Sequence, residues 1–177
     1  MEHVTSTTEH PSIAHAADGE LLQFLTFTVA DSEYGVDIMS VREIKGWAEI
    51  TRLPNRPDYM RGVMNLRGVI IPIFDLRCRF GQGQTHADEK NVVIILAVEE
   101  RIIGILVDTV SDIVHISRPE IKPAPRQDEN ALSERFIDGL IAMDNRMVVL
   151  LQINQLFRHD EVDTGAGVLH SSDSHAG

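Results

Sequence analysis

The chain has 177 residues, with 16 Lys and Arg against 27 Asp and Glu, which gives a formal net charge of −11. This acidic balance disfavours nucleic-acid binding and docking on anionic lipid, since both require a basic surface. The single cysteine, Cys78, excludes an intrachain disulfide and a cysteine-rich metal site. The sequence shows neither a secretory signal nor an apolar run long enough to cross a bilayer, so we expect a cytoplasmic protein without membrane insertion.

Both ends of the sequence are polar and poor in large apolar side chains. Residues 1–20 and 159–177 are rich in Ser, Thr, His, Ala and acidic residues. Segments of this composition cannot bury enough apolar surface to offset the entropy lost on ordering, so they are predicted to be disordered tails. The folded part is then expected over 21–158.

Short apolar runs rich in β-branched residues follow one another through this part. They predict strands at 21–29, 34–38, 68–74, 91–98, 101–107 and 146–153. Polar residues at 31–33 and 99–100 separate two pairs of runs and indicate hairpins. Helices are predicted only as short segments, at 57–61, 75–80 and 153–157. The predicted fold class is therefore all-β, with small closed or nearly closed sheets.

The sequence contains an internal repeat in two blocks. When Gly35 is aligned with Gly104, each copy is a hairpin followed by Val-x-acid-Ile, and 62–80 aligns over 139–157 without a gap. This order predicts two similar lobes, roughly 21–85 and 90–158, and leaves an exchange of strands between them open. The doubled pattern also predicts that eight residues are buried: Leu25, Phe27, Ile71, Ile73, Ile94, Leu96, Val148 and Leu150.

No group of residues in the sequence predicts catalysis. There is no phosphate-binding loop of the Walker type, no dinucleotide fingerprint and no Gly-x-Ser-x-Gly elbow. Most histidines lie in the tails, and nothing pairs the scattered carboxylates for acid–base chemistry. We therefore expect no enzyme activity, no bound metal and no cofactor.

The long polar connector at 46–68 offers a contact surface instead. It ends in Arg67-Gly68, which is typical of a tight turn. The repeat aligns Asp144 with Arg67, so the second copy keeps the strand–turn–strand pattern but lacks the cation. A fold requirement would account for the turn itself, whereas an arginine present in one copy only favours a binding role.

Five segments together resemble the CheW family: 33–44, 51–80, 104–116, 118–125 and 136–143. Their most specific feature is Val-x-Glu-Ile followed by Asn-Leu-Arg-Gly and then Pro-x-x-Asp-Leu-Arg. The resemblance implies two five-stranded β-barrels packed side by side and a non-catalytic adaptor role. It also implies two partners, the histidine kinase CheA and the cytoplasmic tip of chemoreceptors, at membrane-associated receptor arrays.

The resemblance further implies that the helical receptor tip lies in a groove between the lobes. The match to the family pattern assigns six residues to this receptor-binding surface: Val41, Glu43, Gly62, Asn65, Arg67 and Val110. We expect Glu43 and Arg67 to approach one another or a shared receptor segment. The kinase is expected to contact the ends of the barrels.

Two alternative functions stay open on the sequence. The same adaptor could serve a chemosensory pathway for twitching, biofilm formation or second-messenger signalling. A small-barrel enzyme or ligand binder is the more remote alternative, and it would require a pocket with convergent polar groups.

Overall fold

The structure is a computed structural model that describes residues 19–125 and 135–157. The strands are β1 (Leu21–Val29), β2 (Ser32–Asp37), β3 (Val41–Gly46), β4 (Met60–Leu66), β5 (Val69–Asp75), β6 (Val92–Val98), β7 (Arg101–Val107), β8 (Thr109–Ser117), β9 (Ile137–Met143) and β10 (Arg146–Leu151). The helices are α1 (Leu76–Arg79), α2 (Ile153–Leu156) and the 3-10 turns η1 (Ile38–Ser40) and η2 (Arg118–Glu120). The predicted all-β class with only short helices is confirmed, and no helix of the described residues is long and apolar enough to cross a membrane.

The helix predicted at 57–61 is wrong. Met60 already belongs to β4, and its backbone N–H donates to the Pro57 carbonyl in a single turn. The Tyr59 carbonyl accepts from the Asp75 backbone N–H at 2.7 Å, which ties this segment to the end of β5. The tails predicted to be disordered, 1–20 and 159–177, lie outside the described residues except for the two residues before β1.

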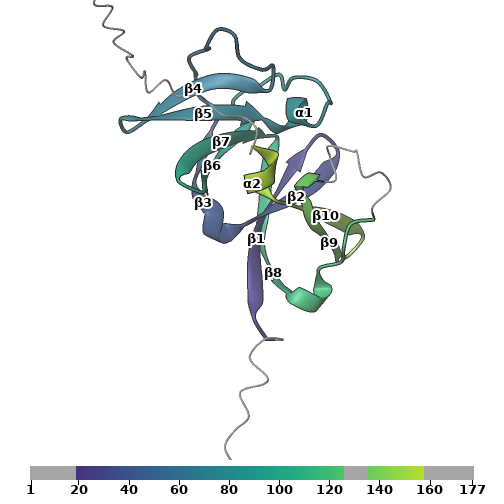
Figure 1. Cartoon of the computed structure of the whole chain (residues 1–177). Coiled ribbons are helices and arrows are strands. Elements are labelled where there is room, and N and C mark those ends of the chain that lie inside the picture. The colour runs from purple at the N-terminus through teal and green to yellow at the C-terminus, as the bar shows by residue number, and fades with distance from the viewer. Residues whose placement is uncertain (1–18, 126–134, 158–177) are drawn as a thin grey trace, which may run out of the picture.

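The ten strands form two five-stranded sheets (Figure 1). Sheet A has the order β8-β1-β2-β10-β9, and sheet B has the order β3-β6-β7-β5-β4. Each sheet combines a hairpin from one half of the chain with three strands from the other half. The lobes are therefore not the continuous ranges 21–85 and 90–158, because the chain crosses from one sheet to the other at η1 and again at Asp108.

The repeated glycines mark the place where the two halves of each sheet join. Gly35 in β2 lies opposite Leu150 in β10, and Gly104 in β7 lies opposite Ile73 in β5, both in parallel ladders. A Cβ at Gly35 would lie 3.0 Å from Leu150 Cδ2, and one at Gly104 would lie 2.5 Å from Ile73 Cδ1. Since Ile73 and Leu150 are equivalent in the repeat, the same close approach is built twice.

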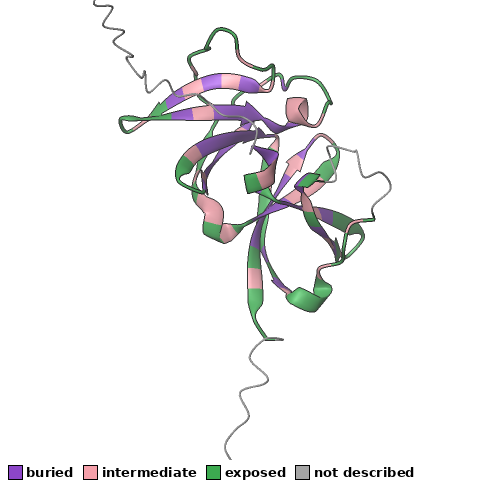
Figure 2. Cartoon of the chain, in the orientation of Figure 1, coloured by how far each residue is buried: buried purple, intermediate pink, exposed green. Residues whose placement is uncertain are grey.

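Apolar side chains of the described residues pack in three clusters. Figure 2 colours the buried positions purple. One cluster is formed by sheet A around Phe24 and one by sheet B around Met64. The third joins the two sheets, with Phe27 from β1 in the same cluster as Phe74 from β5. The eight residues predicted to be buried are all at most 2% exposed, so this prediction is confirmed.

Candidate functional site

Glu43 and Arg67 come from opposite edges of sheet B. Glu43 lies in the edge strand β3, and Arg67 directly follows the other edge strand, β4. The sheet curls until the two side chains meet, and Arg67 Nη2 donates to Glu43 Oε2 at 2.6 Å. Lys45 Nζ lies 3.5 Å from Glu43 Oε1. The expected approach of Glu43 and Arg67 is confirmed, and it shows how strongly sheet B bends back on itself.

The turn between β4 and β5 fixes the position of Arg67. Arg67 and Gly68 both have positive φ angles, 50° and 87°, as in the tight turns that match the twist of a hairpin. Asn65 Oδ1 accepts a hydrogen bond from the Gly68 backbone N–H at 2.8 Å. Asn65 therefore shapes the turn, while the Arg67 side chain stays 73% exposed and accessible to a partner.

The ion pair at this turn is charged at neutral pH. The hydrogen bond from Arg67 lowers the pKa of Glu43 below its ordinary value of 4.5, and the positive charges of Arg67 and Lys45 lower it further. One anion and two cations thus lie together on the surface of sheet B. Such an arrangement can recognise a partner surface of complementary charge.

Gly62, another residue assigned to the receptor surface, is buried beneath the connector between β3 and β4. Its φ angle is +145°, and a Cβ there would overlap the Thr51 carbonyl. Val63, which follows Gly62 in β4, exchanges two backbone hydrogen bonds of 2.9 and 2.8 Å with Thr51. The second copy repeats this bridge between Lys122 and Leu140. Gly62 therefore holds the connector in place, because the absence of a side chain lets the Thr51 backbone pack directly against it.

Val41 and Val110 occupy equivalent places in the two copies. Each lies at the start of a strand, directly after the chain crosses between the sheets: Val41 is the first residue of β3 and Val110 the second residue of β8. Both are half-buried and pack against the cluster between the sheets. The structure thus brings Glu43, Arg67 and the Asn65 turn together, and it places the two valines on the central core.

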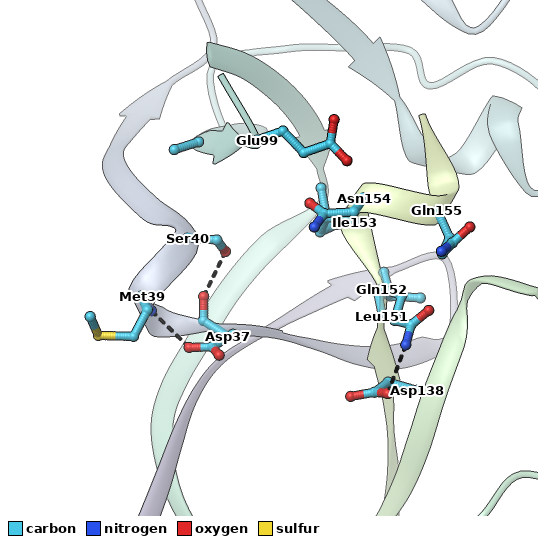
Figure 3. Close-up of a pocket in the computed structure, with 11 residues that line it drawn as sticks. Asp37, Met39, Ser40, Glu99, Asp138, Leu151, Gln152, Ile153, Asn154 and Gln155 are labelled. Atoms are coloured by element: carbon cyan, nitrogen blue, oxygen red, sulfur yellow. Dashed lines mark hydrogen bonds between the residues drawn. The ribbon is translucent and has the colours of Figure 1, made fainter. Parts of the chain in front are cut away.

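A cleft that the sequence does not predict separates η1 from α2 (Figure 3). It has a volume of about 500 Å³ and is lined by η1, the β6–β7 turn, β9 and α2. The carboxylate residues Asp37, Glu99 and Asp138 line it together with Met39, whose surface is 77% exposed. These residues come from separate segments, so no local sequence pattern marks the cleft.

Comparison with known proteins gives consistent relationships. A family described as CheW-like domain matches residues 23–161. The chain is 44% identical over 140 residues to chemotaxis protein CheW of Klebsiella aerogenes, which covers 79% of this chain and 84% of that protein. It is 40% identical over 139 residues to probable chemotaxis protein CheW of Rhizobium etli, across 78% of this chain and 89% of that protein. The crystal structure of scaffolding protein TtCheW from Thermoanaerobacter tengcongensis superposes with a TM-score of 0.71 at 30% identity, over 78% of this chain and 93% of that one. This chain therefore belongs to the CheW family.

Proposed function

We propose that this chain is a non-catalytic adaptor that links chemoreceptors to the histidine kinase CheA in chemotaxis signalling. It would work in the cytoplasm, at receptor arrays. The relatives described above are named as chemotaxis and scaffolding proteins, which supports this pathway over twitching or biofilm signalling.

The observation that carries the proposal is the presentation of Arg67. Asp144 has the same φ angle, 50°, at the equivalent turn of sheet A, so both copies build the same hairpin end. At this turn position only sheet B carries a cation, and Arg67 pairs with Glu43 at 2.6 Å while remaining mostly exposed. In sheet A the nearest cation, Arg146, lies at the start of β10 and pairs with Glu33 at 2.9 Å. A side chain that the fold does not require in both copies, yet holds in a defined place, fits a role in partner binding.

The hydrogen bonds of the buried Asp75 carboxylate support a non-catalytic role. Asp75 is 0% exposed and accepts hydrogen bonds from the Thr85 backbone and hydroxyl, both at 2.7 Å, and from Arg61 at 3.2 Å. It also accepts from the Cys78 backbone N–H as the N-cap of α1. Its oxygens are used to anchor the loop before β6, which is a structural task.

The substitution Arg67→Glu tests the proposal with each partner separately. It reverses the charge at an exposed side chain, so the protein should stay folded. Affinity for a receptor signalling fragment should fall by at least about tenfold, because a contact is lost and a repulsion is added. Calorimetry should show unchanged affinity for the CheA regulatory domain, which is expected to dock elsewhere.

The matched control is Asp144→Arg, at the equivalent turn of the second copy. It should leave both affinities close to those of the native chain. Equal loss of both partners in Arg67→Glu, or unfolding of that variant, would refute the assignment of Arg67 to the receptor surface.

A further inference from the structure

The internal repeat supplies a second copy of the junction that forms the cleft. In that copy the equivalent of Met39 is Asp108, the equivalent of Asn154 is Arg77, and the equivalent of Glu99 is Ala30. There the Ala30 backbone N–H donates to Asp108 Oδ2 at 2.7 Å, and Arg77 Nη2 donates to the same oxygen at 3.3 Å. A guanidinium from α1 thus crosses the junction and is held by a carboxylate.

The cleft between η1 and α2 has the same framework without this guanidinium. Glu99 has a φ angle of 55° and Ala30 one of 53°, so the two hairpin turns have matching backbones. Asn154 takes the place of Arg77, and its side chain is too short to cross. Met39 takes the place of Asp108 and is 77% exposed. The result is an open space of about 500 Å³ where the other copy is bridged by its own arginine.

The charge of the cleft matches the group that is missing. Asp37, Glu99 and Asp138 line it, and among the residues that the structure describes its lining includes neither Lys nor Arg. Asp138 Oδ1 accepts from Gln152 Nε2 at 3.0 Å, and Asp37 Oδ1 accepts from a backbone N–H, so both are held in place by neutral donors. Figure 3 shows Glu99 and Asp138 on opposite sides of the opening. In the other copy, Arg61 takes the place of Asp138 and Asp75 takes the place of Gln152. These two residues form an ion pair of 3.2 Å, which neutralises the charge there.

We propose that this cleft binds an arginine or lysine side chain presented by a receptor segment, with Met39 packed against an apolar residue of the same segment. The inference rests on the proposed adaptor function. It commits to the receptor because Ser40 lines the cleft and Val41 follows it directly, with Glu43 of the proposed receptor surface two residues further along β3. One segment can therefore contact the surface at Glu43 and enter the cleft.

Two variants of the full chain test the proposal with a receptor signalling fragment. Glu99→Lys with Asp138→Lys reverses the charge of the lining. Met39→Asp with Asn154→Arg rebuilds the closed junction of the other copy, so that the chain's own guanidinium fills the cleft. Glu89→Lys, at an exposed acidic position in the loop before β6, is the control for a charge reversal outside the cleft.

Both cleft variants should lose receptor affinity by at least about tenfold, while Glu89→Lys should bind as the native chain does. The closing variant should melt no lower than the native chain, since it copies a junction that the fold already contains. Native receptor affinity in the two cleft variants would overturn the proposal, even if Arg67→Glu abolishes receptor binding.

A second measurement does not depend on the receptor. In NMR titrations, the peptide acetyl-Leu-Arg-Leu-amide should shift the backbone amides of Met39, Glu99 and Asp138 in a saturable way. The shifts should be absent in the closing variant and with acetyl-Leu-Glu-Leu-amide. If the native chain binds no receptor fragment, the adaptor proposal fails, and the peptide titration still decides whether the cleft takes a basic side chain. No shift at the cleft would overturn the inference.

Discussion

Substituting Gly104 by Ala tests the contact that joins β7 to β5. The added Cβ would lie 2.5 Å from Ile73 Cδ1 and 2.9 Å from Val93 Cγ1, and both side chains are 0% exposed. They cannot move into solvent, so overpacking should cost about 1–3 kcal/mol. Part of this is offset by about 0.5–1 kcal/mol, because Ala loses less chain entropy on folding than Gly. We expect a net loss of about 1–2 kcal/mol in the free energy of unfolding, which lowers the melting temperature by about 2–8 °C.

Gly35→Ala is the matched control in the other sheet. Its Cβ would lie 3.0 Å from Leu150 Cδ2, which leaves room for a small shift, so the loss should stay below about 1 kcal/mol. Ile73→Val removes the methyl group that blocks the site and should cost about 0.5–1.5 kcal/mol alone. Combined with Gly104→Ala, the two losses should not add. Urea unfolding of the native chain, the three single variants and the double variant measures these losses. Equal losses for the two glycine variants, or a fully additive double mutant, would refute the reasoning.

Asp75→Ala should lower the free energy of unfolding by about 3–5 kcal/mol in urea, because the partly buried Arg61 guanidinium loses its partner. Gln152→Ala, at the equivalent exposed position, should change it by less than about 0.5 kcal/mol, and similar values for both would contradict this account. The pKa of Glu43, followed by NMR, should lie below 4.5 in the native chain and rise toward that value in Arg67→Ala. The pair therefore stabilises the fold above the unfolded-state pKa of Glu43, and this contribution is lost as the pH falls through the lower native pKa. An identical Glu43 pKa in both proteins would argue against the hydrogen bond.

The sequence predicts interior strands well and edge strands poorly. The runs at 91–98 and 101–107 became β6 and β7, which are mostly buried and therefore read as continuous apolar segments. The strands that no apolar run predicts are β3, β4, β8 and β9, which are the four edges of the two sheets. In β3, half-buried residues alternate with exposed ones, so no apolar run forms. Edge strands expose more of their side chains to solvent. Their polar and charged residues therefore interrupt the apolar runs from which a strand is predicted.

The position of Pro72 is also partly predictable from the sequence. A proline cannot donate to a ladder, which predicts an edge or a bulge at this position. β5 is an interior strand of sheet B, but its ladder to β7 covers only Ile73–Asp75. Pro72 therefore lies where β5 pairs with β4 alone, and its missing N–H interrupts no bond to β7.

The exchange of hairpins between the lobes could not be predicted from the repeat. Both hairpins carry the same glycine and the same apolar pattern, so each could pair with either set of remaining strands. The approach of Glu43 to Arg67 could be expected only from the family pattern. Their strands are opposite edges of one sheet, so no local sequence pattern brings the two residues together. Gly62 contacts the Thr51 backbone closely, and its assignment to the receptor surface stays a prediction. Sequence patterns identify equivalent residues, whereas curvature of the sheet decides which of them meet.

The adaptor role is tested most directly by kinase activity in a reconstituted mixture of chemoreceptor fragments and CheA, with and without this chain. The account predicts that receptor stimulus controls CheA activity only when the chain is present. Arg67→Glu should abolish that control and Asp144→Arg should preserve it. Control of CheA by the receptor without the chain, or no change when the chain is added, would contradict the proposed function.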